Sequence, residues 1–397
     1  MEVRRMRVAD GAASGRVRLT AEVRYDGGLA PEEYWFEVAA AVAGDLSNSG
    51  NPWLVAMLPL AAMLGEPLRL EAPAEAGLID NARRVMEIWR AWYPDVEVVE
   101  IDADPLEDGD SRSPGRVGAF FSGGVDSFFT ALRPRDKAAG AERIAIDELL
   151  TVRGFDIPLS AAEAFSGLRE TAARAARELG YDFLDVATNL RTGRWDGLPW
   201  GPLGHGCALV GTALALENRY GAAVVPATGG YRDLHPWGSH PLTDPLLSTN
   251  SLRIIHDGAA FTRVDKLRLL TDSPTALRAL RVCWESRSDR NCGACPKCIR
   301  TMAVLDLLGV LNRCDSFPCR RVAPRAVARL RCGESWDYRE LRDLRDLALQ
   351  VGRGEMVKAA EGAMRRSHVR GWFRKGALSL ARKAVPSLPR GDGRGLG

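Results

Sequence analysis

The sequence contains no long hydrophobic run, little net charge and no segment of the signal-peptide kind. Its most apolar stretch, residues 53–64, is shorter than the roughly 20 residues that span a bilayer and contains Pro59. Three arginines lie within the first seven residues, but no apolar segment follows them. The net charge of the 397 residues is +3, which by itself does not indicate a nucleic acid partner. We therefore expect a cytoplasmic protein that does not use a membrane as its partner.

Four of the eight cysteines are closely spaced, and we expect all eight to be reduced in the cytoplasm. The four follow the pattern C-x8-C-x2-C-x2-C and are Cys283, Cys292, Cys295 and Cys298. Thiols at this spacing can surround one ion, and Zn²⁺ is the first choice because four thiolates form its usual structural site. A [4Fe–4S] cluster is the rival because it also takes four thiolates. Disulfides or inert buried thiols are the less specific interpretation.

A glycine-rich turn follows a short apolar run near the end of the first third of the chain. The run covers residues 117–121, and the turn consists of Ser122, Gly123, Gly124, Val125, Asp126 and Ser127. This pattern predicts a buried parallel strand that leads into the N-terminus of a helix. Glycines let backbone N–H groups approach an anion, and a helix N-terminus attracts negative charge. Because the two serine hydroxyls suit phosphate oxygens and Asp126 suits Mg²⁺, the turn predicts a polyphosphate site.

The turn is not a Walker A loop, because no Gly-Lys-Ser or Gly-Lys-Thr follows it. An ordinary strand–turn–helix corner is the structural alternative, since serine and glycine are common in turns. Farther along the chain, Arg263 and Lys266 are three residues apart and share a face if the segment is helical. There they would stabilise a leaving pyrophosphate, and together with Asp126 they are the predicted catalytic residues. An exposed charged helix face is the other interpretation of the two cations.

From residue 116 onward, apolar runs alternate with helical patterns, which predicts a doubly wound parallel sheet of the α/β class. We expect strands over residues 117–121, 148–153, 182–187 and 222–227, and helices near residues 126–132, 161–179 and 205–220. Ligands bind at the carboxyl ends of such strands, where polar loops meet. We therefore assign Val152, Asn189 and Arg232, which lie at or after three strand ends, to nucleotide binding. A solvated turn is the alternative for each.

Composition divides the chain into four segments. Residues 1–112 form an N-terminal α+β domain of unknown role, with a linker rich in Asp, Ser, Pro and Gly near its end. Within it we expect strands over residues 16–25, 67–71 and 96–101, and helices over residues 31–46, 53–64 and 75–92. Residues 113–282 form the nucleotide-binding domain, and residues 283–312 form a four-cysteine metal knot with a following helix. Residues 313–397 form a helical C-terminal region that ends in a basic tail.

The two motifs together resemble those of a known family. The SGGVDS turn at residues 122–127 resembles the PP-loop of the N-type ATP pyrophosphatase superfamily, whose members split ATP into AMP and pyrophosphate and leave AMP on a substrate oxygen. A PP-loop followed at a distance by this cysteine pattern and by Arg300 resembles 7-cyano-7-deazaguanine synthase. The resemblance implies an adenine nucleotide alpha-hydrolase-like fold, ATP and Mg²⁺ at the turn, and structural zinc at the four cysteines. It also matches Lys266 to a lysine of that family.

The resemblance covers roughly residues 116–311, and the chain departs from the family elsewhere. More than a hundred residues precede the turn, whereas the synthase begins close to its PP-loop. The deazapurine-recognition segments of the synthase are not recognisable. The resemblance implies an ATP-dependent ligase that adenylates a carboxylate or an amide, after which ammonia or an amine attacks to give an amide or a nitrile. The expected partners are a small-molecule or carrier-peptide substrate and a donor of ammonia or amine.

Two other functions remain open. A PP-loop sulfurtransferase acting on tRNA or a small molecule would need a reactive thiol, and Cys207 is the candidate because a helix N-terminus would lower its pKa. A nucleotide-binding scaffold without turnover is the second alternative. The basic stretch after residue 365 suits RNA or an anionic surface but is equally typical of a frayed tail. The sequence also leaves a homodimer open.

Overall fold

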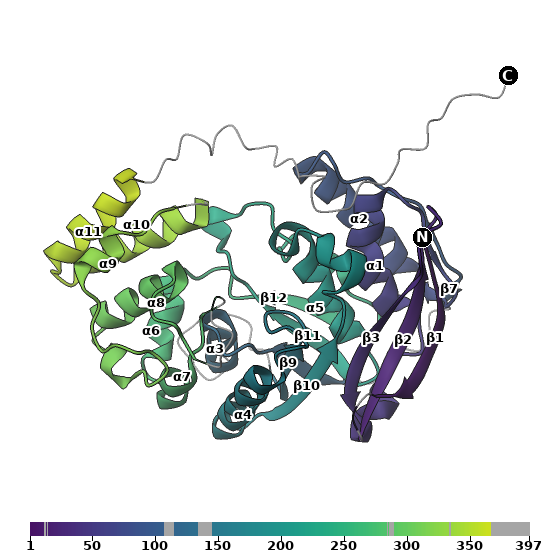
Figure 1. Cartoon of the computed structure of the whole chain (residues 1–397), viewed down its shortest axis with the longest axis horizontal. Helices are drawn as coiled ribbons and strands as arrows, with labels where there is room; N and C mark the ends of the chain where they lie inside the picture. Colours follow the sequence, from purple (N-terminus) through teal and green to yellow (C-terminus); the bar gives the residue numbers. More distant parts are fainter. Residues whose placement is uncertain are drawn as a thin grey trace.

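The computed structural model of the chain describes residues 1–11, 13, 15–106, 115–133, 145–283, 285, 290–332 and 335–366. Nearly all of the predicted basic tail lies outside this part of the chain, and so does most of the predicted linker. Within the described residues, ten strands form one mixed sheet in the order β12-β11-β8-β9-β10-β3-β2-β1-β4-β6 (Figure 1). The α/β class predicted from the sequence is therefore confirmed.

Five parallel strands make up the half of the sheet that carries the predicted nucleotide loop. They are β8 (Arg116–Phe120), β9 (Glu148–Arg153), β10 (Asp182–Thr188), β11 (Tyr220–Pro226) and β12 (Arg253–Asp257). The chain runs from β8 outward to β9 and β10, and then returns to place β11 and β12 on the other side of β8. The strand order therefore reverses between β8 and β11, and ligands of doubly wound sheets bind at such a reversal.

Helices cover both faces of these parallel strands. On one face lie α3 (Val125–Leu132), α4 (Ala162–Leu179) and α6 (Arg263–Leu270), and on the other lie α1 (Asn51–Leu64) and α5 (His205–Leu214). Phe120 is buried among α1 and α5, whereas its neighbour Phe121 is buried beside α3. Successive residues of a strand point to opposite faces, so the apolar run that ends in the turn contributes to both layers of the core.

The N-terminal residues add a second half to the same sheet, in which antiparallel and parallel pairs both occur. It consists of β1 (Glu2–Asp10), β2 (Arg16–Arg24) and β3 (Glu32–Ala39), with the short strands β4 (Leu68–Leu70) and β6 (Ile101–Asp102) beyond β1. Helices α1 and α2 (Ala76–Trp92) pack against this half (Figure 1). A separate two-stranded sheet joins β5 (Ala74–Glu75) to β7 (Pro105–Leu106).

The helix predicted over residues 31–46 is wrong. Residues 32–39 form β3, and the short 3-10 helix η1 (Ala40–Asp45) follows. Tyr34, Phe36 and Val38 are buried, so the large apolar residues recur at every second position, which is the period of a strand. The strand predicted over residues 96–101 is also wrong for most of its length, because only its last residue belongs to β6.

An antiparallel pair between β3 and β10 joins the two halves of the sheet. The Asn189 side chain, just after β10, accepts a hydrogen bond from Trp35 N (2.8 Å) and donates one to Glu33 O (2.8 Å). Thr188 Oγ1 donates to the Trp35 carbonyl at 2.7 Å. The sheet is therefore continuous between the N-terminal strands and the parallel strands.

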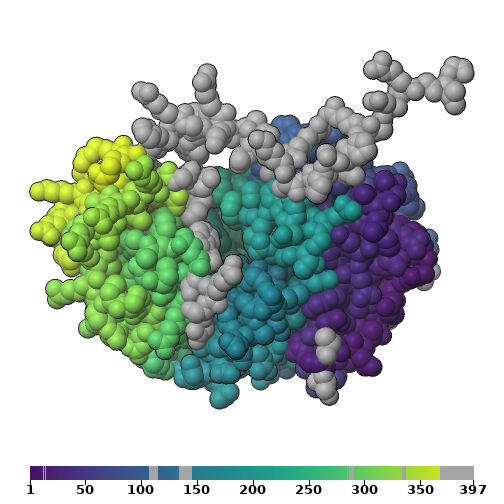
Figure 2. Space-filling view, in the orientation of Figure 1, coloured from purple at the N-terminus to yellow at the C-terminus, as the bar shows by residue number. Residues whose placement is uncertain are grey.

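The cysteine motif and the C-terminal helices extend the layer that contains α3. A single buried apolar cluster joins α3 and α6 to α7 (Pro274–Ala279), α8 (Pro296–Leu307), α9 (Pro324–Ala328), α10 (Ser335–Gln350) and α11 (Gly354–Arg366). Figure 2 shows these segments, in green to yellow, at the opposite end of the molecule from the purple N-terminal strands. Among the described residues, no helix combines the length and the apolar character that crossing a bilayer requires.

Candidate active site

The predicted glycine-rich turn lies at the carboxyl end of β8, where the strand order reverses, and leads directly into α3. Gly124 is the N-cap of α3, and Gly123 has a φ of +73°, which residues with side chains rarely adopt. The Gly123 carbonyl accepts a hydrogen bond from Arg281 N at 2.8 Å, which ties the turn to the segment before the cysteine motif. Ser122 is exposed, whereas the buried Ser127 hydroxyl donates to Gly124 O at 3.1 Å. The turn therefore combines a helix N-terminus with one exposed hydroxyl.

Asp126, in the first turn of α3, forms ion pairs with both cations that the sequence analysis selected. Lys266 Nζ donates to Asp126 Oδ1 at 2.9 Å, and Arg263 Nη1 donates to Asp126 Oδ2 at 3.4 Å. Lys266 is buried and also donates to the carbonyl of Ala227, which follows β11. The fold thus brings Asp126 of α3 together with Arg263 and Lys266 of α6, which lie more than a hundred positions later in the sequence.

A capping box begins α6 and sets the direction of its two cations. Thr262 Oγ1 accepts a hydrogen bond from Asp265 N at 3.1 Å, and the Asp265 carboxylate accepts one from Thr262 N at 3.0 Å. Because the helix begins at Arg263, that residue and Lys266 lie one turn apart on the same face. This face packs against α3, so both cations reach Asp126.

The local charges keep Asp126 ionised. Burial raises the pKa of this carboxyl, but the positive charges of Lys266 and Arg263 outweigh the effect of burial and hold the pKa below its usual value. Asp126 therefore carries a negative charge at neutral pH. An ionised carboxylate at a helix N-terminus, with two cations beside it, can hold a Mg²⁺ ion together with a phosphate group.

Residues that the sequence analysis missed extend this group of charges. Glu340 of α10 lies 3.6 Å from Arg263 Nε and accepts a hydrogen bond from Arg300 Nε of α8 at 2.6 Å. Lys297, one turn before Arg300, is half-buried. Burial lowers the pKa of Lys297, and the charge of Arg263 lowers it further. We refer to Asp126, Arg263, Lys266, Arg300 and Glu340 as the Asp126 cluster.

The four cysteines predicted to bind metal lie together in the segment from the end of α7 to the first turn of α8. Their Sγ atoms all lie within 4.8 Å of one another, and the Cys283–Cys295 and Cys292–Cys298 sulfurs are 3.9 Å apart. Zn–S bonds of about 2.3 Å in a tetrahedron place sulfurs about 3.8 Å apart, so the spacing fits one ion such as zinc. Burial raises the pKa of Cys295 to about 11 and raises the pKa of Cys298 well above its usual value. A cation is therefore needed to hold these sulfurs as thiolates.

Two neighbouring residues hold the cysteine loop in its conformation. The buried Asn291 side chain accepts hydrogen bonds from Val282 N at 2.8 Å and Cys283 N at 3.1 Å. Gly293 has a φ of +70°, and a Cβ at this position would lie 2.4 Å from Pro318 Cγ. The loop is therefore shaped by its own backbone and by its neighbours as well as by the thiols.

The three residues assigned to nucleotide binding at the other strand ends have different surroundings. Asn189 binds β3 through both atoms of its amide group, as described above. Arg232, in the short helix η6 (Tyr231–Asp233), is 57% exposed and pairs with Asp343 of α10 at 2.9 Å. Val152 is half-buried near the end of β9. In the described part of the chain, no hydrogen bond or ion pair links Asn189 or Arg232 to Asp126.

Aromatic side chains gather in the loops that follow β9, β10 and β11. The Trp200 ring centroid lies 5.1 Å from that of Phe155 and 6.0 Å from that of His205, and Trp237 lies 5.9 Å from His205. The Arg191 guanidinium lies 4.4 Å from the Trp200 ring centroid. Burial lowers the pKa of His205, so its ring is neutral at pH 7. Flat rings and a cation thus lie at the same edge of the sheet as Asp126.

The expected activation of Cys207 by a helix N-terminus is wrong. Its side chain is 1% exposed inside α5, and burial raises the pKa of the thiol well above its usual value. Since the thiolate is the nucleophilic form, a thiol with a raised pKa is unreactive at neutral pH. Cys207 is therefore a core residue in this fold.

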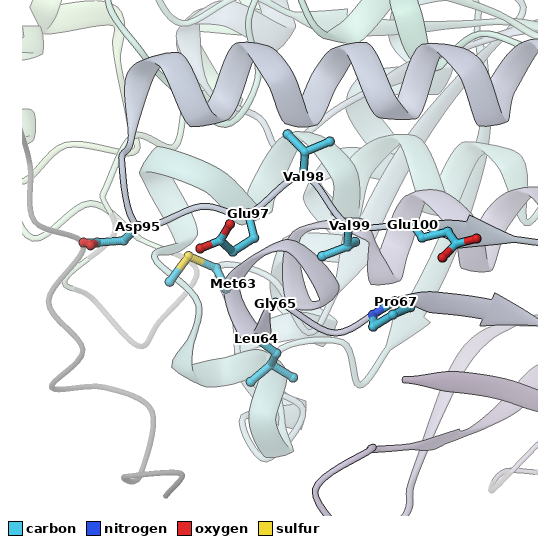
Figure 3. A pocket seen from close by; sticks show the side chains of 9 residues that line it. All are labelled: Met63, Leu64, Gly65, Pro67, Asp95, Glu97, Val98, Val99 and Glu100. Atoms are coloured by element: carbon cyan, nitrogen blue, oxygen red, sulfur yellow. The ribbon is translucent and has the colours of Figure 1, made fainter. Parts of the chain in front are cut away.

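Two of the cavities formed by the described residues, both larger than 400 Å³, lie away from the Asp126 cluster. One, of about 420 Å³, lies beside the end of α1, and Figure 3 shows its carboxylates Asp95, Glu97 and Glu100 pointing in different directions. The other, of about 610 Å³, lies between α8 and α9 beside the cysteine loop. Neither is lined by a residue of the Asp126 cluster.

Comparison with family models, with curated proteins and with solved structures finds no match for this chain. Support for a function therefore comes from the residues, from their geometry and from the resemblance of the two sequence motifs.

Proposed function

We propose that this protein is an ATP-dependent ligase that activates a carboxylate or an amide by adenylation. Ammonia or an amine then attacks the activated acid, whereas the activated amide eliminates AMP. One observation carries the proposal: Lys266 and Arg263 meet Asp126 at the N-terminus of α3, where the strand order of the sheet reverses. The SGGVDS turn resembles the PP-loop of the N-type ATP pyrophosphatases. The resemblance to 7-cyano-7-deazaguanine synthase favours this type of reaction.

In the proposed reaction, the backbone N–H groups of residues 123–127 and the Ser122 hydroxyl bind the phosphates of ATP. Asp126 would hold Mg²⁺, which would supply positive charge beside the phosphates, and Lys266 and Arg263 supply two further cations there. The two cations then stabilise the negative charge that develops on pyrophosphate as the substrate oxygen attacks the α-phosphorus. Ammonia or an amine displaces AMP from an activated acid to give an amide. Loss of AMP from an activated amide gives a nitrile.

The aromatic side chains at this edge of the sheet offer a place for the organic substrate. Trp200 and Trp237 are half-buried, so part of each ring is accessible to a ligand. Arg191, over the Trp200 ring, supplies a cation for a carboxylate. A substrate that combines a flat unsaturated part with an acid or amide group fits this combination.

We propose that the cysteine site holds one structural Zn²⁺ and that the protein works in the reducing cytoplasm. In a [4Fe–4S] cluster each cysteine binds a different iron, so the sulfurs lie farther apart than around a single ion. All four Sγ atoms lie within 4.8 Å here, which favours the single ion. The sulfurtransferase alternative is less favoured, because Cys207 is buried with a raised pKa.

Release of pyrophosphate tests the proposed function. Purified protein is incubated with Mg²⁺, ATP, ammonia and a panel of carboxylic acids and amides, and AMP and pyrophosphate are quantified. Asp126→Asn keeps the shape of the side chain but removes its charge, and it should lower the rate by about 100-fold. Asp315→Asn, at a surface carboxylate that is 66% exposed, is the matched control and should leave the rate unchanged. Full activity in the Asp126 variant would sink the proposal, and ATP binding without AMP formation would favour the scaffold.

A further inference from the structure

Helix α8 connects the cysteine loop to the Asp126 cluster. It begins at Pro296, inside the cysteine motif, and carries Lys297 between Cys295 and Cys298. Arg300 follows Lys297 by three residues, so the two side chains share a face of the helix. The same first turn of α8 therefore provides a proposed metal ligand and a cation.

The face of α8 that carries Arg300 points toward Glu340 and Arg263. Arg300 Nε lies 2.6 Å from one oxygen of Glu340, and the other oxygen of Glu340 lies 3.6 Å from Arg263 Nε. Arg263 in turn lies 3.4 Å from Asp126. Lys297 is half-buried on this face, one turn before Arg300, and its positive charge contributes to lowering the pKa of Asp126. A chain of ion pairs thus runs from the helix of the cysteine motif to the predicted phosphate loop.

We propose that Lys297 binds the pyrophosphate portion of the nucleotide and that the metal ion in the cysteine site positions this lysine. This inference rests on the proposed function. It adds Lys297 to the residues that bind the nucleotide and makes nucleotide affinity depend on the metal ion. The ion would fix Cys295 and Cys298, and with them the first turn of α8 and the direction in which Lys297 leaves it. The metal then governs nucleotide affinity through one lysine, although no cysteine touches the nucleotide.

The physical reason is preorganisation. A lysine side chain has many rotamers, and ordering it for a ligand lowers the affinity that its charge contributes. A metal-fixed helix start and the packing around a half-buried side chain remove part of that cost before ATP arrives. The contribution depends on the β- and γ-phosphates, so it is present for ATP and pyrophosphate and absent for AMP.

Calorimetric titration of the metal-loaded protein tests the role of Lys297. The probes are Mg²⁺–ATP, Mg²⁺–pyrophosphate and AMP. Lys297→Met should weaken binding of the first two by about tenfold and binding of AMP by less than twofold. Lys297→Arg keeps the charge and should restore most of the affinity. Lys358→Met, at an exposed position of α11, is the matched control and should bind like the wild type.

The role of the metal is tested in the same titration. The ion is removed with a chelator, the chelator is dialysed away, and circular dichroism is recorded to check the fold; if removal unfolds the chain, Cys292→Ser takes its place. Affinity for Mg²⁺–ATP should fall by about the same factor as in Lys297→Met, and the metal-free Lys297→Met protein should lose nothing more.

Three outcomes overturn the inference. Unchanged Mg²⁺–ATP affinity in Lys297→Met removes the role of the lysine and leaves the proposed function standing. Equal loss of ATP and AMP affinity means that the substitution disturbs the fold and not a phosphate contact. A wild-type protein that binds no Mg²⁺–ATP removes the proposed function together with the inference.

Discussion

Replacing Lys266 by methionine removes the buried cation of the Asp126 pair and keeps an unbranched side chain in its place. In the wild type, Lys266 Nζ lies 2.9 Å from Asp126 Oδ1 and also donates to Ala227 O, and its side chain is 2% exposed. Breaking a buried ion pair by removing one partner costs about 3–5 kcal/mol. Because Arg263 stays 3.4 Å from Asp126 and the Asp126 side chain is 19% exposed, we expect the low end, about 3 kcal/mol.

Urea denaturation followed by tryptophan fluorescence measures this loss, and a double-mutant cycle with Asp126→Asn assigns it to the pair. The Asp126 variant alone leaves a buried ammonium and should cost a similar amount. The double variant removes both charges, so its loss should be smaller than the sum, with a coupling of about 2 kcal/mol. Lys358→Met is the control and should change the free energy of unfolding by less than about 0.5 kcal/mol. Losses that add within about 0.5 kcal/mol would refute the ion pair.

The pH dependence of the same loss is an independent check. Burial raises the pKa of Asp126, but Lys266 and Arg263 hold it below its usual value in the folded protein. Ionised Asp126 therefore stabilises the wild type above about pH 4, and this contribution is lost as the pH falls through the folded-state pKa. In Lys266→Met less positive charge opposes the effect of burial, so the folded-state pKa of Asp126 is higher than in the wild type. Protonation of Asp126 as the pH falls therefore stabilises the folded variant. The stability difference between the two proteins should shrink as the pH falls from 7 to about 4, and a constant difference would contradict the reasoning.

Two further predictions concern the cysteine loop and Cys207. Gly293→Ala puts a Cβ 2.4 Å from Pro318 Cγ and should lower the metal content, measured by mass spectrometry, well below one ion per chain. Gly309→Ala has a similar φ of +76° with no atom within 4 Å, so it should cost only about 1 kcal/mol of backbone strain and keep the ion. Cys207→Ala should retain pyrophosphate release, and Cys207 of the folded wild type should resist iodoacetamide at neutral pH, because burial raises the pKa of its thiol. Equal metal content in the two glycine variants, or rapid alkylation of Cys207, would show that these assignments are wrong.

The parallel strands were predictable where their own residues carry the pattern. Residues 148–153 form β9 with the predicted bounds, because Leu149, Leu150 and Val152 give this short segment the apolar character of a buried strand. The sequence pattern does not predict β12, because Ile254 and Ile255 are the only apolar residues of this strand. In β3 the three glutamates mask the alternation of the buried residues, and the segment looked helical.

The candidate site was predictable only in part, because only some of its residues belong to a local sequence pattern. Asp126 lies in a local motif, and the spacing of Arg263 and Lys266 is a local signal as well. Glu340 carries no such signal, because its partners belong to helices far away in the sequence. Asn189 shows the opposite case: a polar residue after a strand looks the same whether it meets a ligand or a neighbouring strand, and the pairing of β3 with β10 decides between them.

β3 pairs with β10, which would otherwise be an edge strand of the parallel half of the sheet. A strand at the margin of a sheet offers unpaired N–H and C=O groups to any other chain, which leads to aggregation. β10 would be such a strand if the parallel half stood alone, and β3 pairs with its carboxyl end at Ala187 and Thr188, where Asn189 also binds β3. A fragment that begins at residue 115 would expose this end of β10, and we expect it to aggregate more readily than the full chain.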